Sequence, residues 1–268
     1  MKTLLIPTIL LLGSCCLAAA ATRTYVSSGG TDSPNVTCSR TAPCATIQYA
    51  LGFTDSGGEI DVMDTGDYSG GSKITVTQPV TIDGGAVLAT TAEIDVNTAG
   101  LVILRNLSIA SGAIGVANES TAWLRLEHVA ISGAGLLFGV ECPAGSCALS
   151  DVRIRNAHNS GVGAAVLANG GKVSLTNCIL TDSDVGVATP ENGLAQVDST
   201  TIQFNTIGVS TNGNQTGQPA GAVRLSNSAI TDNGIGLQVA GGSIVSFGNN
   251  RIFGNSTNGN PTLVTTNR

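Results

Sequence analysis

The chain is poor in charged and aromatic side chains. Only 11% of its 268 residues are charged, 3% are aromatic, and there is 1 tryptophan. Because 42% of the residues are hydrophobic, enough apolar surface exists to offset the entropy of ordering, which excludes a disordered polyampholyte. Gly, Asn, Thr, Ser and Val are abundant but form helices poorly, so the composition argues against a mainly helical protein.

Positive charge is the scarcer sign. There are 12 Lys and Arg against 18 Asp and Glu. Without Lys2 the formal charge becomes 11 − 18 = −7, and the remaining lysines are Lys73 and Lys172. Nucleic acids and anionic lipid surfaces require clustered Lys and Arg, so we expect neither as a partner.

Long hydrophobic runs are missing after the N-terminus. Lys2, the run 4–12 and the small residues that follow predict a signal peptide over residues 1–21. Alternatively, Leu12-Gly13-Ser14-Cys15 resembles a bacterial lipoprotein signal, with a lipid anchor at Cys15. No later stretch is apolar enough to span a bilayer. We expect an exported protein, secreted or periplasmic, without a transmembrane segment.

Seven cysteines are present, and two of them belong to the signal segment. In an oxidising compartment, Cys38 with Cys44 and Cys142 with Cys147 could each close a small loop as a disulfide. Metal ligation by these four is the alternative, although two tight Cys-x-x-Cys knuckles are lacking. The leftover Cys178 is interpreted as a buried thiol.

A motif of the form Leu-x-Asn-x-x-Ile repeats along the chain. Its middle positions are Asn106, His128, Asp151, Asn177, Ser199, Asn227 and Asn249, spaced by 22, 23, 26, 22, 28 and 22 residues. A second marker, a glycine between two apolar residues, keeps pace at Gly115, Gly139, Gly163, Gly186, Gly208 and Gly236. Two markers in step at one period indicate stacked repeats.

This period leaves room for about three short strands per repeat, and each copy must stack on the next to bury its apolar face. The pattern predicts an all-β, single-stranded parallel β-helix over residues 22–268, right-handed by the crossover rule. A leucine-rich repeat is the alternative, but it needs a denser leucine pattern.

Within one repeat, Leu225, Ile230, Ile235 and Leu237 should enter the core. Asn227 and Asn233 should occupy corners, where stacked amides can form ladders. The marker glycines should allow tight packing, and the motif alignment gives Phe247 the place of Leu225.

The ends of the predicted solenoid differ from its repeats. Ile47, Ala50 and Leu51 have helical spacing, which predicts a capping helix over 45–51. The polar tail 255–268 should protect the other end.

A resemblance to a known family is carried by TAPCATIQYALGFTDSGGEIDVMDTGDYSG, residues 41–70. This segment resembles the N-terminal cap and first coil of the pectin-lyase-like superfamily of secreted right-handed parallel β-helix proteins. Thr46-Ile47-Gln48, Gly58 to Val62 and Gly66-Asp67-Tyr68 match its helix, strand and turn. The resemblance covers residues 23–268. It implies the fold but not an activity, because the superfamily includes lyases, hydrolases, esterases, epimerases and members without an assigned activity.

Two acids are the candidate catalytic residues. Hydrolysis of a glycosidic bond needs two flanking carboxyls. The repeat places Asp182 and Asp232 in one column, two coils or roughly 10 Å apart. Alternatively, both are solvated turn residues. The Gly-His-Gly and Arg-x-Lys segments of the superfamily's polygalacturonases are absent.

Polysaccharide elimination instead needs cations and a base on one face. The repeat places Arg125 and Arg224 four coils apart, and Arg105 beside Glu127 as an expected ion pair. We therefore expect no basic cluster.

A calcium site is conceivable at Glu59, Asp61, Asp64 and Asp67, although alternation along the strand explains these acids equally well. No other metal or cofactor is expected. His128 and His158 are interpreted as structural.

Trp123 and Arg125 alternate with Leu124 and Leu126, so both should project from one surface and could bind a sugar. We expect a non-catalytic surface or periplasmic scaffold that binds glycans. The alternative is a lyase or glycoside hydrolase acting on an acidic polysaccharide.

Overall fold

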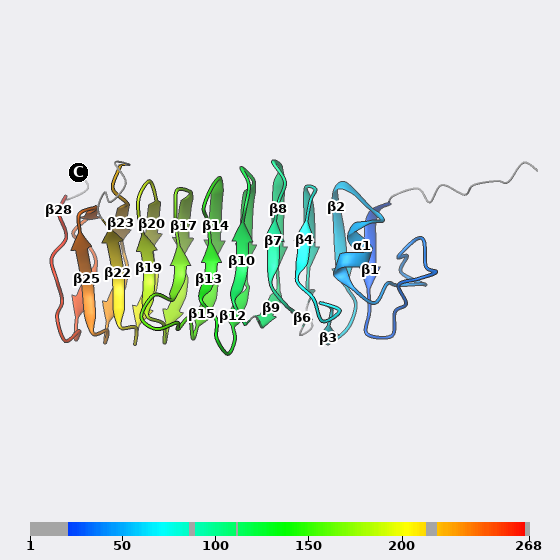
Figure 1. Cartoon of the computed structure of the whole chain (residues 1–268), viewed down its shortest axis with the longest axis horizontal. Helices are drawn as coiled ribbons and strands as arrows, with labels where there is room; N and C mark the ends of the chain where they lie inside the picture. Colours follow the sequence, from blue (N-terminus) through cyan, green and yellow to red (C-terminus); the bar gives the residue numbers. More distant parts are fainter. Residues whose placement is uncertain (1–20, 86–88, 111, 213–218, 266–268) are drawn as a thin grey trace, which may run out of the picture.

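The chain folds into a parallel β-helix, seen from the side in Figure 1. The computed structural model describes residues 21–85, 89–110, 112–212 and 219–265. The predicted signal peptide therefore lies almost entirely outside the described residues. Among those residues, no helix is long and apolar enough to cross a membrane.

Each coil contributes one strand to each of three parallel sheets, which we call sheets I, II and III. Sheet I has 11 strands: β1 (Ala21–Val26), β2 (Thr54–Val62), β5 (Val80–Asp83), β8 (Leu101–Arg105), β11 (Trp123–Glu127), β14 (Ser146–Ser150), β17 (Lys172–Thr176), β20 (Leu194–Asp198), β23 (Ala222–Ser226), β26 (Ser243–Ser246) and β28 (Leu263–Val264).

Sheet II has 9 strands: β3 (Gly66–Asp67), β6 (Ala89–Thr91), β9 (Leu107–Ala110), β12 (Ala130–Ser132), β15 (Arg153–Arg155), β18 (Ile179–Thr181), β21 (Thr201–Gln203), β24 (Ala229–Thr231) and β27 (Arg251–Phe253). Sheet III has 8: β4 (Ile74–Val76), β7 (Ile94–Val96), β10 (Ile114–Asn118), β13 (Phe138–Glu141), β16 (Ala164–Leu167), β19 (Val185–Thr189), β22 (Ile207–Asn212) and β25 (Ile235–Ala240).

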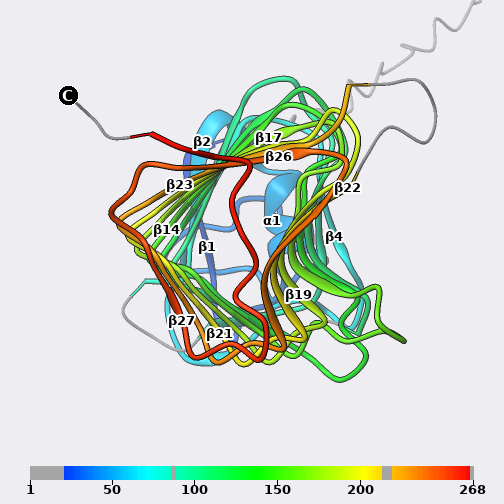
Figure 2. The ribbon, with the colours of Figure 1, turned by 90° about the vertical axis from the view of Figure 1, so that its left-hand side faces the viewer.

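The solenoid is right-handed, as the crossover rule predicts. In Figure 2 the C-terminal coils face the viewer, and the chain approaches while it runs counterclockwise from sheet I (labelled at β23) through sheet II (labelled at β27) to sheet III (labelled at β22). Strand alternation sends every second side chain of sheet I inward. The core is built from stacked equivalent residues such as Leu104, Leu126, Leu149, Leu175, Val197 and Leu225, all buried.

The N-terminal end carries a short helix, α1 (Ile47–Leu51), with Ile47, Ala50 and Leu51 buried. Thr46 is its N-cap and accepts a hydrogen bond from the Tyr49 N–H. The Gln48 side chain accepts a hydrogen bond from the Thr75 N–H, on edge strand β4 of sheet III.

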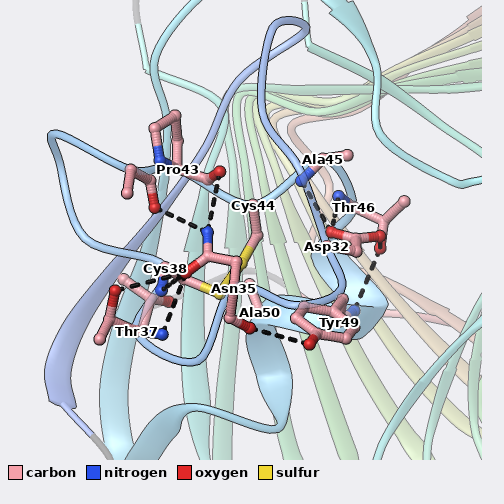
Figure 3. Close-up of a disulfide and its surroundings, with 12 residues drawn as sticks. Asp32, Asn35, Thr37, Cys38, Pro43, Cys44, Ala45, Thr46, Tyr49 and Ala50 are labelled. Atoms are coloured by element: carbon pink, nitrogen blue, oxygen red, sulfur yellow. Dashed lines mark hydrogen bonds between the residues drawn. A yellow bond between two sulfur atoms is a disulfide. The ribbon is translucent and has the colours of Figure 1, made fainter.

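The loop before α1 is held by the disulfide Cys38–Cys44, with a Cα separation of 4.9 Å (Figure 3). Asp32 accepts hydrogen bonds from the Ala45 and Thr46 N–H groups. Asn35 donates to the carbonyls of Ala42 and Pro43, so its amide is already engaged within the loop.

Corner residues behave as predicted at the end of sheet I. The motif positions Asn106, His128, Asp151, Asn177, Ser199 and Asn227 all have φ between 48° and 57°. Asn, Asp and Ser tolerate this left-handed conformation because their short side chains bond locally.

A second column forms a buried amide ladder. The Asn205 side chain donates to Asn233 at 3.0 Å, and Asn233 donates to Asn255 at 2.9 Å. Asn233 is only 3% exposed, so the ladder satisfies amides that water cannot reach.

The marker glycines pack against isoleucines of the next coil. A Cβ on Gly139 would lie 2.3 Å from Ile154 Cγ2, and one on Gly208 would lie 2.8 Å from Ile230 Cγ2. The coil after Gly139 corrects the sequence alignment. The strand register gives Ala165, not Gly163, the marker position, and opposite it stands Leu180 instead of isoleucine. Leucine lacks the branched Cβ, which leaves room for the alanine methyl.

Three further positions differ from expectation. Phe247 does not take the place of Leu225, because Ser246 pairs with Leu225 and is buried while Phe247 faces outward. Ile235 is only half-buried. Part of the tail forms β28, which pairs with β26 and extends sheet I.

We expect Gly208→Ala to destabilise the protein by about 1–3 kcal/mol, the usual effect of overpacking. The added methyl would lie 2.7 Å from the Gly236 carbonyl oxygen. Urea unfolding monitored by circular dichroism measures the change. Gly29→Ala is the control, since its methyl would meet only Ser27 Oγ at 4.0 Å. Equal midpoints for the two variants would contradict the packing role.

Candidate functional site

The outer face of sheet I aligns side chains of successive coils in rows. One row holds Leu101, Trp123, Ser146, Lys172 and Leu194. The neighbouring row holds Ile103, Arg125, Ala148, Ser174, Gln196 and Arg224. The predicted column of Arg125 and Arg224, four coils apart, is thus present.

Trp123 and Arg125 project outward together from β11. They alternate with Leu124 and Leu126, which are buried in the core. Trp123 is 67% exposed, so most of its indole surface is in contact with solvent. The sequence pattern therefore placed both side chains on the surface where they lie.

A depression of about 260 Å³ lies beside Trp123. Ser146 lies between Trp123 and Lys172 in one row, and Ala148 lies between Arg125 and Ser174 in the neighbouring row. Because the side chains of Ser146, Ala148 and Ser174 are small, the surface is hollow where the neighbouring coils carry large ones.

A disulfide lies under this depression. Cys142 and Cys147 are paired, with a Cα separation of 6.5 Å, and both are buried. The bridge joins the end of β13 to β14 and so fixes the strand that carries Ser146 and Ala148. Cys178 is buried without a disulfide partner, and burial raises the pKa of its thiol.

A second depression, of about 310 Å³, continues the first along the solenoid. The two share Ser174 and Gln196, and the second adds Asp198, Arg224 and Phe247. Together they form a groove parallel to the solenoid axis, which we call the sheet I groove.

The cations of the sheet I groove are not ion-paired. Arg125, Lys172 and Arg224 make no salt bridge with any residue that the structure describes. Glu127 and Asp198 lie in the adjacent row and leave these three charges uncompensated at close range.

Arginines do gather at the N-terminal end of sheet I, but an equal number of acids accompanies them, so the cluster is not basic in net charge. Arg23, Arg40 and Arg105 line a depression of about 370 Å³ together with acidic residues. The repeat motif could not show this, because Arg23 on β1 and Arg40 in the loop that follows both precede the first copy of the motif.

The same region corrects the expected Arg105–Glu127 ion pair. Although the two residues are register partners, Arg105 turns to the preceding coils and binds Asp83 at 2.8 Å and Glu59 at 2.7 Å. Arg23 binds Glu59 at 2.8 Å and Asp61 at 3.4 Å.

Of the four predicted calcium ligands, the structure brings together two. Glu59 and Asp61 meet Asp83, which was not among the predicted ligands, with one oxygen of each within 4.8 Å of the others. Asp64 and Asp67 bind elsewhere, Asp64 to Ser27 and Ser28 and Asp67 to the Ser69 N–H. The four residues therefore do not form one site.

Arginines largely neutralise the Glu59, Asp61 and Asp83 cluster. Burial raises the pKa of Glu59, but the hydrogen bond and charge of Arg23 outweigh it, so the pKa lies below its usual value. Burial and the neighbouring Glu59 charge raise the pKa of Asp61. Ion pairing with Arg23 and Arg105 gives these carboxylates partners other than a metal ion.

Asp64 forms a tight turn with Tyr68, which is fully buried. The Tyr68 hydroxyl hydrogen-bonds the Asp64 carboxylate and its backbone carbonyl. The Tyr68 contact and the Ser28 N–H lower the pKa of Asp64 to about 2, whereas burial and the Asp64 carboxylate raise the pKa of Tyr68. The Gly66-Asp67-Tyr68 motif thus has a structural role.

Asp182 and Asp232 do share a column, two coils apart. Thr181 pairs with Gln203 and Gln203 with Thr231, so Phe204 stands between the two acids. Asp182 and Asp232 are both exposed and left-handed, with φ of 51° and 57°. These features fit the turn interpretation, and Phe204 occupies the column position between the two acids.

The acid that holds the backbone in this segment is Asp184. One of its carboxylate oxygens accepts the backbone N–H groups of Asn159, Gly161 and Gly163, and the other meets His158 Nδ1 at 2.9 Å. Burial raises the pKa of Asp184, but these hydrogen bonds bring it below its usual value. His158 thus has the expected structural role. His128 lies 3.7 Å from Asp151 at an exposed corner.

We expect Asp184→Asn to loosen the loop 157–163. The neutral amide loses the charge-assisted hydrogen bonds, so exchange of the Gly161 and Gly163 N–H groups should accelerate by about tenfold or more. Amide exchange followed by NMR measures this. Asp182→Asn is the matched control, because that side chain is exposed and Asn suits its left-handed backbone. Unchanged exchange in Asp184→Asn would contradict the role.

Acid should weaken the turn that Asp64 holds. Its folded pKa of about 2 lies below the unfolded value of about 3.9, so the stabilisation is complete above that value. It is lost as the pH falls towards about 2. The ¹³C carboxyl shift of Asp64 reports the titration, and Tyr68→Phe should move its midpoint upward. A midpoint near the unfolded value in the parent would refute this.

Comparison with known proteins bears on the fold. No protein family matches the sequence, and no curated protein does. Among solved structures, pectate lyase Pel9A matches with a TM-score of 0.50 and 13% sequence identity. The match covers 85% of this chain and 76% of the other. At this identity the match shows the fold alone, a parallel β-helix like that of the pectate lyase.

Proposed function

We propose that the protein is an exported, non-catalytic scaffold that binds an acidic polysaccharide along the sheet I groove. The observation that supports this most is the exposed Trp123 beside a hollow flanked by the unpaired cations Arg125 and Lys172. An indole face packs against the apolar face of a sugar ring. Arg and Lys attract a carboxylate on the same sugar or the next.

The spacing of the cations suits a linear polymer. Arg125, Lys172 and Arg224 lie on β11, β17 and β23, each two coils from the next. One coil advances about 4.8 Å, so successive cations stand about 10 Å apart along the axis. A polyanion lying in the groove would meet one cation roughly every second sugar.

Export is supported by the cysteines. The pairs Cys38–Cys44 and Cys142–Cys147 form disulfides, which persist in oxidising compartments. The predicted signal peptide over 1–21 fits the same compartment. The lipid anchor at Cys15 remains the alternative route to the cell surface.

The acid that lines the groove supports binding rather than turnover. Asp198 accepts hydrogen bonds from Ser226, Asn227 and Ser199, which lower its pKa. A general base must be available to take a proton from substrate, and a carboxylate held in this way with a lowered pKa is a weak one. In a non-catalytic scaffold, such a carboxylate stabilises the fold.

Retention on immobilised polygalacturonate tests the proposal. Trp123→Ala and Arg125→Gln should each weaken binding about tenfold or more, as truncation of a central contact does, and salt should weaken binding further. Phe253→Ala and Arg251→Gln are the controls, since both residues are exposed on sheet II. Trp123 is mostly in solvent, so its truncation should leave the unfolding midpoint unchanged.

Two results would contradict the proposal. Retention that survives Trp123→Ala would remove the sheet I groove as the binding surface. Unsaturated products or new reducing ends released by the parent would show turnover and so refute a non-catalytic role.

A further inference from the structure

A second candidate site lies at the corner between sheets II and III, away from the sheet I groove (Figure 2). One position of this corner is left-handed in successive coils. Its residues are Asn156, Asp182, Phe204, Asp232 and Gly254, with φ of 65°, 51°, 58°, 57° and 73°. Four of the five are residue types that accept this conformation.

Phe204 is the exception. A bulky side chain in the left-handed region costs about 1–2 kcal/mol, which Asn or Gly at the same place largely avoids. Its ring does not recover this cost by packing, because it is 57% exposed and stacks on no described aromatic ring. Folding therefore does not explain why phenylalanine occupies this corner.

The surroundings of Phe204 are polar and acidic. Asp182 and Asp232 flank it in the column, each one coil or about 4.8 Å away. Both carboxylates are exposed, and neither is ion-paired within the described residues. The arginines Arg155 on β15 and Arg251 on β27 are each two coils from Phe204, so the acids are the charged groups next to it in the column.

We propose that Phe204, Asp182 and Asp232 bind an uncharged sugar. The ring offers an apolar platform, and the carboxylates accept hydrogen bonds from hydroxyl groups. The same carboxylates repel an anionic sugar, so this site selects against the ligand proposed for sheet I. One molecule would then bridge an acidic and a neutral polysaccharide, a role beyond binding at the sheet I groove.

The decisive variant is Phe204→Asn. Asn prefers the left-handed backbone, so the urea midpoint should stay equal or rise. Affinity for uncharged polymers should fall about tenfold or more. The probes are β-glucan, xylan and mannan in affinity gels, and the parent should be retained by at least one. Ser199→Asn, with φ of 50° at the other corner, is the matched control and should bind like the parent.

The two proposed sites are distinguished by measuring the variant of each site on the ligand of the other. Phe204→Asn should leave polygalacturonate binding unchanged, and Trp123→Ala should leave neutral-polymer binding unchanged, so either proposal can fail alone. Absence of retention on all three neutral polymers overturns the inference. Retention on cationic chitosan alone also overturns it, as does a joint loss of stability and binding in Phe204→Asn.

Discussion

Parallel backbone pairing between successive coils is the constraint on which this structure depends. A single coil cannot bury its apolar residues, so each coil is stable only when its strands hydrogen-bond to those before and after it. The pairing holds equivalent residues one above another, and this stacks Leu126 on Leu104 in the core and Asn205 on Asn233 at a corner. Gly139 and Gly208 then follow, because coils this close leave no room for a Cβ beside the facing isoleucine.

The same pairing organises the surface. Outward side chains fall into rows along the axis, and the chemistry of a row depends on what successive coils place in it. At the N-terminal end of sheet I, Arg23 and Arg105 neutralise the facing acids. Towards the middle, the coil after Trp123 and Arg125 places the small residues Ser146 and Ala148 beside them, and a hollow results. Charge balance thus divides one continuous face into a structural part and a part open to ligand.

Sequence periodicity predicted the fold, the direction of Trp123 and Arg125, the Asp182 column and the burial of Cys178, because all of these follow from register alone. It failed where coils change in length, and where a substitution at one repeat position is matched by a substitution at the position it faces. Ala165 replaces a marker glycine only because Leu180 replaces an isoleucine one coil later. The partners of Arg105 depend on side-chain rotation, and Asp83 and Asp184 act through contacts with residues over 20 positions away. Periodicity has no signal for either.

The left-handed corners have a consequence for how such a chain can diversify. At these positions the backbone conformation is fixed by neighbouring coils, while the side chain points to solvent and packs against little, as Phe204 and Asp232 do. Exchanges there alter local stability by small amounts, yet they change what the surface presents to the medium. Substitutions in the corner column can therefore change the surface chemistry of the solenoid one coil at a time, without repacking its interior.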